Sequence, residues 1–283
     1  MNTQQMKKTI FITGAGKGFG FEIAKAALMA GDRVIATVRS NPDLLSEKLN
    51  HHPDLIVVSM DVSRESEVRE AVELSIGQFG NIDVLINNAG FGMVTAIEEA
   101  SDAEVRRQYD TNVFGLLNVT RSALPYLRAQ RSGHIINISS MFGFDVIPGW
   151  GIYGSTKFAV EGISKGLAIE LAPLGIKVTV VEPGLFSTDF LSPESSSASA
   201  NVIADYHDSV GQMRQNAVKL NGHQQGDPKK LALAIIKLYQ SEQPPLHLPL
   251  GSDAVDFYKN NILKTGKDVE DWIAVSTGTD HDK

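Results

Sequence analysis

Short apolar runs rich in isoleucine and valine alternate along this chain with longer segments in which apolar residues recur every three or four positions. Such runs predict buried strands, and the longer segments predict amphipathic helices. Six runs precede residue 185 and a candidate seventh follows later: 8–13, 33–39, 55–62, 82–90, 134–140, 176–184 and 244–251. The alternation predicts a doubly wound α/β fold, in which a mostly parallel sheet of about seven strands carries helices on both faces in three layers, α/β/α.

No break in composition divides the chain, so we expect residues 1–283 to form a single domain with two additions. The segment at roughly 186–226 contains a Ser-rich stretch with little periodicity, which predicts a mobile insert over the substrate side. A plain disordered surface loop is an equal alternative at this point. The segment at roughly 252–283 predicts a helical C-terminal extension of one or two helices and a polar end.

Composition narrows the classes of function. The 283 residues are 42% hydrophobic and 21% charged, as in an ordinary globular protein. A net charge of −7 and the lack of a Lys/Arg-rich run argue against a nucleic-acid partner. The chain has no cysteine, which excludes disulfides and thiolate chemistry, and we predict no metal site. No signal segment is evident and no apolar stretch approaches the roughly 18 residues of a membrane span, so we expect a cytoplasmic protein without a membrane partner.

A glycine-rich turn directly follows the first predicted strand. It reads TGAGKGFG from Thr13 to Gly20 and opens the first predicted helix. A turn in this position brings backbone N–H groups and a helix N-terminus to a phosphate, so it predicts nucleotide binding. A tight turn without a ligand is the alternative, but the strand–turn–helix context favours the nucleotide.

Tyr153 and Lys157 lie four residues apart, and Ser140 precedes the tyrosine by 13 residues. If a helix begins near Gly151, the phenol and the ammonium share one face. At ~4 Å and an effective dielectric of ~20 their attraction is about 4 kcal/mol. Before any cost of burial, this could lower a tyrosine pKa from about 10 to about 7. Such a tyrosine can exchange a proton while a serine hydroxyl holds a substrate oxygen. Taken alone, the pair is more simply explained as part of an ordinary amphipathic helix.

Five motifs, in this order, resemble those of the short-chain dehydrogenase/reductase family: TGAGKGFG at Thr13, NNAG at Asn87, Asn112, the Ser140–Tyr153 spacing, and YGSTK at Tyr153. The match covers most of residues 7–190 and implies a Rossmann-type fold of the single-domain oxidoreductase kind. Near the C-terminus, GDPKKLA and PPLHLPLGSDAV resemble a subgroup described as 17β-hydroxysteroid dehydrogenase-like. That likeness does not establish a steroid substrate.

The resemblance implies a catalytic set of Asn112, Ser140, Tyr153 and Lys157. Tyr153 would be the acid/base, and Lys157 would lower its pKa and hydrogen-bond the nicotinamide ribose. Ser140, rather than Ser139, would polarise the substrate carbonyl, and Asn112 would hold a water near Lys157. For Asn112, a hydrogen bond inside a long helix is the structural alternative.

The resemblance also implies a nicotinamide-nucleotide site built from several loops. Asp61 would accept a hydrogen bond from the adenine beside the Val62 backbone, with a helix-capping role as the alternative, and Thr188 would hold the carboxamide. Phe19 and Phe186 depart from the aliphatic residues that are usual in the family. The implied cofactor-binding residues are Gly14, Gly16, Lys17, Gly18, Phe19, Gly20, Arg39, Asp61, Val62, Asn88, Ala89, Gly90, Tyr153, Lys157, Pro183, Gly184, Phe186 and Thr188.

The end of the second predicted strand indicates which nucleotide is bound. An acidic residue there would bind the 2′-hydroxyl of NAD and repel the 2′-phosphate of NADP. This strand ends instead in Arg39, whose guanidinium suits a phosphate, and Lys17 adds a second positive charge. We therefore predict NADP(H) as the cofactor. The alternative is that both side chains point into solvent.

Together these features predict an NADP(H)-dependent oxidoreductase that interconverts a carbonyl and a secondary or primary alcohol. Apolar residues in the insert and near the expected pocket suggest an apolar, aromatic or steroid-like substrate, although several could simply be core residues. They are Gly92, Met93, Phe142, Phe144, Val146, Ile147, Trp150, Phe190, Leu191, Val202, Ile203, Tyr206 and Met213. An NADPH-binding regulator without turnover is the alternative, disfavoured by the intact catalytic set. The family's use of paired long helices implies a homodimer or homotetramer through 101–131 and 152–172.

Overall fold

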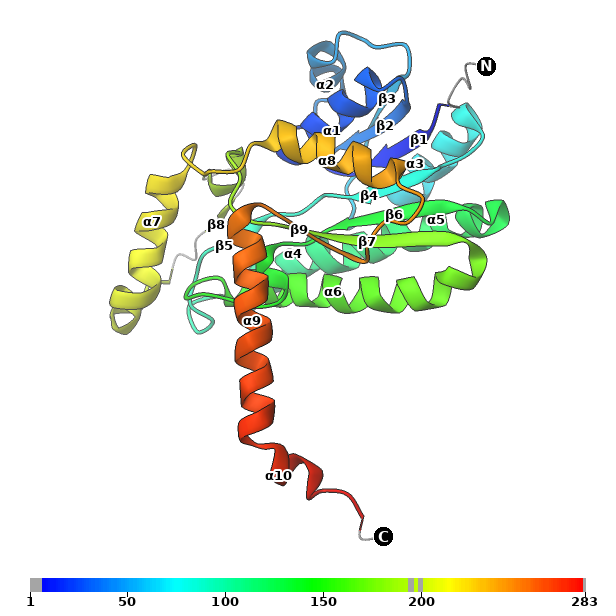
Figure 1. Ribbon diagram of the computed structural model, residues 1–283. Helices are drawn as coiled ribbons and strands as arrows, with labels where there is room; N and C mark the ends of the chain where they lie inside the picture. The colour runs from blue at the N-terminus through cyan, green and yellow to red at the C-terminus, as the bar shows by residue number, and fades with distance from the viewer. Residues whose placement is uncertain (1–6, 193–195, 198–200, 282–283) are drawn as a thin grey trace.

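Seven parallel strands form the central sheet of the computed structural model, which describes residues 7–192, 196–197 and 201–281. Their order is β3-β2-β1-β4-β6-β7-β9 (Figure 1). The strands are β1 (Thr9–Ile12), β2 (Arg33–Val38), β3 (Leu55–Ser59), β4 (Val84–Asn87), β6 (Gly133–Ile138), β7 (Ile176–Pro183) and β9 (His247–Leu250). The predicted sheet, including its candidate seventh strand, is confirmed.

Helices cover both faces of this sheet (Figure 1). One face carries α1 (Gly18–Met29), α2 (Pro42–Lys48) and α8 (Pro228–Gln240). The other carries α3 (Glu65–Phe79), α5 (Leu116–Gln130) and α6 (Gly151–Leu171). The predicted long helix at 101–131 is α4 (Asp102–Tyr109) continued into α5 through a π-helical segment, Asp110–Gly115.

Side chains of β1 show why a strand of this sheet is mostly apolar. Ile10 and Ile12 pack in the core shared with α1 and α8, whereas Phe11 packs in the core shared with α3 and α5. All three are fully buried. Because successive side chains point to opposite faces, a strand covered on both faces is apolar at most of its positions rather than at every second one.

The segment after β7 leaves the sheet and contacts the loop after β4. β8 (Ser196–Ser197) pairs in parallel with β5 (Gly92–Met93), and α7 (Gln212–Leu220) stands outside the sheet layers (Figure 1). Positions 193–195 and 198–200 of the predicted mobile insert lie outside the described residues. The mobility of the insert stays a prediction.

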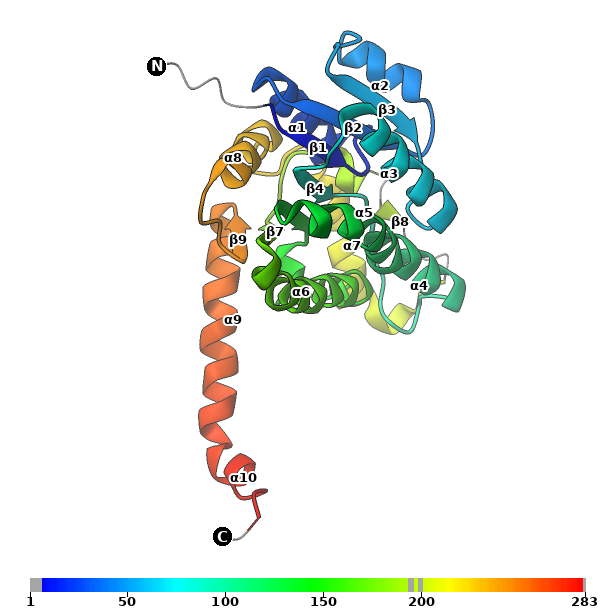
Figure 2. The ribbon, with the colours of Figure 1, turned by 90° about the vertical axis from the view of Figure 1, so that its right-hand side faces the viewer.

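The chain ends in a helical arm. α9 (Ser252–Asp271) follows β9 directly, extends away from the sheet and is followed by α10 (Ile273–Thr277) (Figure 1, Figure 2). Two helices therefore occur where the C-terminal extension was expected. Across the described ranges, no helix combines the length and the apolar character needed to cross a membrane.

Candidate active site

Most of the residues predicted to bind cofactor or react lie at the carboxyl ends of the parallel strands. β1 and β4 are adjacent in the middle of the sheet, and the following strands are added outward from them in opposite directions. A cavity of about 450 Å³ opens at their carboxyl ends, between the glycine loop and the segments that follow β4, β6 and β7. Ligands of doubly wound sheets bind at such a switch point.

Two positions of the glycine loop pack too closely against neighbouring backbone to carry a side chain. Gly14 has φ +68°, and a Cβ on it would lie 2.9 Å from the Cα of Ala89. A Cβ on Gly20 would lie 2.5 Å from the carbonyl oxygen of Gly14. α1 begins at Gly18, which lines the cavity, so the free N–H groups of its first turn are placed to receive a phosphate.

The NNAG turn holds this loop in place. Asn88 donates from Nδ2 to the carbonyl oxygens of Thr13 at 2.9 Å and Gly14 at 3.0 Å. In return the Thr13 hydroxyl accepts from the backbone N–H groups of Asn88 and Ala89, both at 3.0 Å. Asn88, Ala89 and Gly90 also line the cavity, so the turn both supports the loop and contributes to the site.

Ser140, Tyr153 and Lys157 meet in the same cavity. Ser140 lies beyond the end of β6, and the other two lie on α6, which begins at Gly151 as the predicted pairing requires. Their exposed fractions are 8%, 5% and 6%, respectively. Lys157 Nζ donates to the carbonyl oxygen of Ile138 at 2.9 Å and lies 5.6 Å from the centroid of the Tyr153 ring.

Burial dominates the ionisation of this pair. It raises the pKa of the Tyr153 phenol above its usual value, and a hydrogen bond with Ser140 offsets only part of that rise. Burial also lowers the pKa of Lys157 to about 8, although the nearby Glu161 carboxylate opposes this. Of these contacts it is the hydrogen bond with Ser140 that lowers the pKa of Tyr153, and the lowering expected from Lys157 stays a prediction.

Asn112 supports the site from outside the cavity lining. Its amide nitrogen donates to the Phe91 carbonyl oxygen at 3.0 Å and to the Thr156 hydroxyl at 3.1 Å. Its amide oxygen accepts from the Phe91 N–H at 3.1 Å. The residue lies in the π-helical segment, a feature often found at functional sites. These bonds tie α6 to the loop after β4, and the predicted role in holding a water stays a prediction.

Three predicted site residues do not line the cavity: Gly20, Asp61 and Asn112. Asp61 lies between Met60 and Val62, which do line it. Its Oδ1 atom accepts from the Ser63 N–H at 2.9 Å and from the Ser63 hydroxyl at 2.7 Å. Burial alone would raise the pKa of Asp61, but these bonds and the nearby Arg39 guanidinium lower it. Its predicted contact with adenine stays a prediction.

The wall beside Tyr153 is aromatic. Phe142 and Trp150 stack with ring centroids 5.1 Å apart, and Trp150 and Phe190 stack at 6.5 Å. These three line the cavity with Leu191, as predicted. The other residues expected near the pocket do not line it: Gly92, Met93, Phe144, Val146, Ile147, Val202, Ile203, Tyr206 and Met213.

Known proteins share this sequence and fold. The family described as short chain dehydrogenase matches residues 8–199. A 3-ketodihydrosphingosine reductase from Bacteroides thetaiotaomicron is 41% identical over 243 residues, covering 86% of this chain and 87% of that protein. A short-chain dehydrogenase structure from Streptomyces avermitilis has 39% identity and a TM-score of 0.91, covering 98% of this chain and 100% of that one. ElxO, solved with NADP bound, has 28% identity and a TM-score of 0.72, covering 89% of this chain and 100% of that one.

This chain belongs to the short-chain dehydrogenase family. It is therefore an oxidoreductase, and the predictions of the family and of a Rossmann-type fold are confirmed. Solved relatives hold either nicotinamide nucleotide, since ElxO holds NADP and a reductase from Brucella melitensis, also 28% identical, holds NADH.

The two phenylalanines that depart from the short-chain dehydrogenase pattern contact each other. The rings of Phe19 and Phe186 meet edge to face, with centroids 5.3 Å apart and planes at 81°. Phe186 also packs against Gly226, where a Cβ would lie 2.5 Å from the ring. The two substitutions, which look unrelated in the sequence, thus form one aromatic contact between the glycine loop and the loop after β7.

Sequence reasoning missed part of the lining of this dehydrogenase. Lys48 ends α2 and lines the same cavity as Lys17 and Arg39, so three basic side chains besides Lys157 contribute to it. Ser40 and Asn41 line it as well. No motif marks Lys48. Its place follows from the packing of the short helix α2 through Leu45, a tertiary contact that periodicity over seven residues does not reveal.

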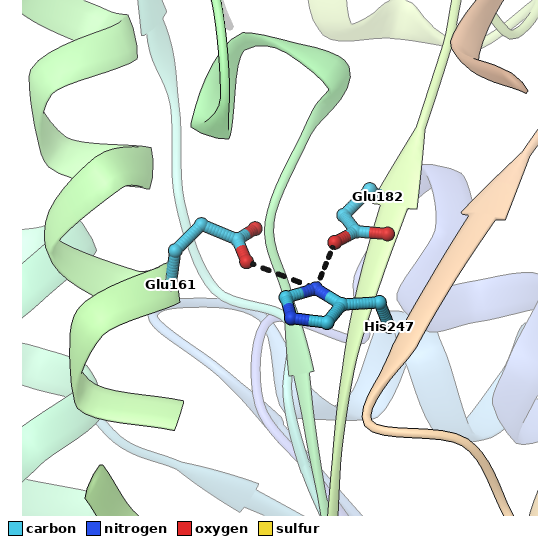
Figure 3. Close-up of side chains that lie close together, drawn as sticks. All are labelled: Glu161, Glu182 and His247. Carbon is cyan, nitrogen blue, oxygen red and sulfur yellow. Dashed lines mark hydrogen bonds and ion pairs between the residues drawn. The ribbon is translucent and has the colours of Figure 1, made fainter. Parts of the chain in front are cut away.

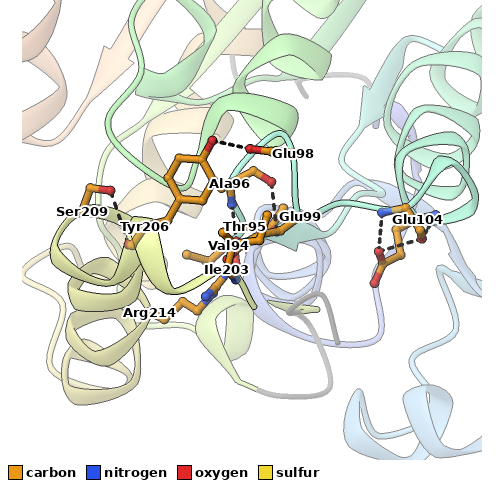
Figure 4. A network of polar contacts seen from close by, with 11 residues as sticks. Val94, Thr95, Ala96, Glu98, Glu99, Glu104, Ile203, Tyr206, Ser209 and Arg214 are labelled. Atoms are coloured by element: carbon orange, nitrogen blue, oxygen red, sulfur yellow. Dashed lines mark hydrogen bonds and ion pairs between the residues drawn. The ribbon is translucent and has the colours of Figure 1, made fainter. Parts of the chain in front are cut away.

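Polar contacts fasten the insert to the loop after β5 (Figure 4). The Arg214 guanidinium pairs with the Glu99 carboxylate and donates from Nε to the Val94 carbonyl oxygen at 3.2 Å. Glu99, only 2% exposed, also accepts from the N–H groups of Ile203 at 3.0 Å and Ala96 at 2.8 Å. Burial alone would raise the pKa of Glu99, but these bonds and Arg214 lower it.

Proposed function

We propose that this protein is an NADP(H)-dependent oxidoreductase that interconverts a carbonyl and a secondary or primary alcohol, with Tyr153 as general acid/base. One observation carries the proposal. A single cavity joins a glycine loop suited to phosphates with the hydroxyl groups of Ser140 and Tyr153 and the ammonium of Lys157. Phosphate binding and proton transfer are the two tasks that a nicotinamide-dependent carbonyl reductase needs from its protein.

The two hydroxyl groups would hold the carbonyl oxygen of the substrate. Because burial raises the pKa of Tyr153, its phenol carries a proton at neutral pH and can donate that proton to the forming alcohol oxygen. Bound NADPH supplies the hydride. Lys157, with a pKa of about 8, keeps a proton close to the phenol and can help restore the acid after each turnover. In the reverse direction Tyr153 would accept the proton from the alcohol.

The choice of NADP(H) rests on charge. Lys17, Arg39 and Lys48 line the cavity, and the end of β2 bears no carboxylate that would repel a 2′-phosphate. A hydrogen bond between charged groups contributes roughly 1.5 to 3 kcal/mol. Arg39→Ala should therefore raise the KM for NADPH about 10-fold or more, while the KM for NADH changes little.

An apolar substrate fits the wall around Tyr153. Phe142, Trp150, Phe190 and Leu191 present rings and an aliphatic side chain to the cavity. A relative of this chain is a 3-ketodihydrosphingosine reductase, whose name describes the reduction of a ketone. We therefore propose a ketone or aldehyde on an apolar, aromatic or steroid-like body.

A carbonyl screen tests this proposal. Oxidation of NADPH would be followed with ketones, aldehydes, quinones and steroids, and KM would be compared for NADPH and NADH. We expect turnover with an apolar carbonyl compound and a lower KM for NADPH. A clear preference for NADH would contradict the choice of cofactor. Tight NADPH binding without turnover of any substrate would instead favour the alternative that the protein is an NADPH-binding regulator without catalytic activity.

We also propose that the protein is cytoplasmic and forms a homodimer or homotetramer. Phe114 and Phe158 support association because they lie on the helices expected to pair and are 53% and 46% exposed. Sedimentation of the full chain tests this, and a monomer at micromolar concentration would contradict it.

A further inference from the structure

Glu161, Glu182 and His247 converge at a point that is not part of the cavity lining (Figure 3). They come from three neighbouring elements, α6, β7 and β9. His247 Nδ1 lies 2.7 Å from Glu182 Oε1 and 3.6 Å from Glu161 Oε2. The three donor atoms all lie within 4.8 Å of one another, so a single ion could contact all of them.

The two carboxylates of this cluster are buried and incompletely paired. The side chain of Glu182 is 0% exposed and that of Glu161 is 8% exposed. Among the described residues, neither Oε1 of Glu161 nor Oε2 of Glu182 has a partner in good hydrogen-bond geometry. The Ser139 hydroxyl and the Leu248 backbone lie close enough to lower the pKa of Glu161 and Glu182, respectively, but neither carries a charge. Even a protonated His247 would balance only one of two negative charges. Because buried charge without a partner is costly, an additional positive charge would stabilise the ionised form of this cluster.

The protonation equilibria agree with this deficit. Burial raises the pKa of Glu161 to about 7 and that of Glu182 to about 8. Burial also lowers the pKa of His247, which favours the neutral imidazole that a metal ion requires. At mildly alkaline pH both carboxylates and the imidazole would be free of protons and able to act as ligands.

We propose that Glu161, Glu182 and His247 bind one divalent transition-metal ion, and that Zn²⁺ is the best match. Two carboxylate oxygens and one imidazole nitrogen are zinc ligands, whereas Mg²⁺ and Ca²⁺ prefer oxygen alone. Three protein ligands leave a fourth position for water.

The distances need only a small adjustment. Bonds of about 2.1 Å in a tetrahedral site separate the donor atoms by about 3.4 Å. The 3.6 Å between His247 and Glu161 already suits this geometry, and Glu182 must withdraw from 2.7 Å by less than about 1 Å. His247 lies on the edge strand β9 and its side chain is 25% exposed, which provides an entry path for the ion.

Two neighbouring lysines are electrostatically coupled to this metal site. Lys165 on α6 lies close enough to lower the pKa of both carboxylates and of His247, so it competes with a bound cation. Glu161 in turn raises the pKa of Lys157. A cation on Glu161 would cancel part of that negative charge, so metal binding would lower the pKa of the active-site lysine.

Metal binding to the full-length protein tests the proposal without any measurement of activity. Chelator-treated protein at about pH 8.5 would be titrated with Co²⁺ and followed by its visible absorption, and Zn²⁺ affinity would be measured against a coloured chelator. We expect one ion per chain. Glu182→Gln and His247→Phe should weaken the affinity by more than the roughly 10- to 100-fold that loss of an outer partner costs.

Control variants separate this site from adventitious binding. His207→Phe removes an exposed ring that pairs with Asp208 on the surface, and it should leave the affinity unchanged. Lys165→Ala should strengthen the affinity, whereas Lys25→Ala, on the exposed side of α1, should not. No stoichiometric binding by the wild-type protein would overturn the proposal. So would an affinity that is unchanged in Glu182→Gln, His247→Phe and Lys165→Ala. Since Lys165 is exposed, its variant decides the matter even if the other two fail to fold.

Discussion

The phenol of Tyr153 is surrounded by aromatic rings, and this burial determines its chemistry. Its ring contacts Trp150 at 5.4 Å, Phe190 at 5.5 Å and Phe142 at 6.4 Å between centroids. The positions of Tyr153 and Lys157 could be predicted from their spacing on one helix. Their ionisation could not, because it depends on how fully the fold buries them, including the packing of Phe190 from the segment after β7.

The pH dependence of reduction should follow Lys157. Its pKa of about 8 is below the usual lysine value, so its positive charge is complete at low pH and is lost as pH rises through about 8. If the charged lysine restores the proton of Tyr153, kcat/KM for carbonyl reduction at saturating NADPH should be level below that pH and fall above it. Glu161→Gln removes a charge that raises the pKa of Lys157, so the fall should begin at lower pH. An inflection that does not move would contradict this role of Lys157.

The contact between Phe19 and Phe186 should be measurable as a coupling energy. An edge-to-face pair contributes about 0.5 to 1.5 kcal/mol beyond the area it buries. In a cycle of Phe19→Leu, Phe186→Leu and the double variant, measured by urea unfolding, we expect a coupling of that size. The control pairs Phe19→Leu with Phe79→Leu, whose ring packs in the core on the opposite face of the sheet and should behave additively. Additive changes in both cycles would contradict the contact.

At the scale of elements, predictability depends on where the contacts of each element lie. Strands such as β1 and β4 could be predicted because both of their faces are buried, which makes three of the four residues of each strand apolar. The position of the helical part of the insert, against the loop after β5, could not be predicted. Its anchor is the pair of Arg214 with Glu99, which joins residues distant in sequence, and no local pattern encodes such a pair.

Loss of this anchor should affect substrate binding. The insert includes Phe190 and Leu191, which line the cavity, so freeing it should loosen the aromatic wall. Because Arg214 is partly exposed while Glu99 is buried, its removal should cost less than the about 3 to 5 kcal/mol of a fully buried pair. A 10-fold change in KM corresponds to about 1.4 kcal/mol. We expect Arg214→Ala to raise the KM for substrate at least about 10-fold with a small change in the KM for NADPH.

Arg106→Ala is the matched control. Arg106 and Asp102 form an exposed pair on α4, with side chains 74% and 79% exposed, and such pairs contribute little. Equal KM values in both variants would show that the buried anchor does not shape the site.

At the scale of the whole molecule, the sheet brings together parts of the chain that carry different tasks. The glycine loop follows β1, the serine follows β6, and the tyrosine and lysine lie on α6. The family motifs implied that these groups share one site, and the observed strand order places that site at the switch point. The motifs did not reveal Lys48, whose place depends on the packing of the short helix α2, or the contact of Phe19 with Phe186, which depends on the packing of two loops.

The central claim is that one cavity binds NADPH and uses Tyr153 as the acid that completes carbonyl reduction. Tyr153→Phe tests it most directly, because it removes a single hydroxyl and keeps the ring that packs against Trp150 and Phe142. NADPH affinity and steady-state turnover would be measured for this variant and for wild type with the best substrate from the carbonyl screen. We predict that NADPH binds with affinity close to wild type while kcat falls about 100- to 10,000-fold. Turnover at the wild-type rate by a variant that binds NADPH would contradict the claim.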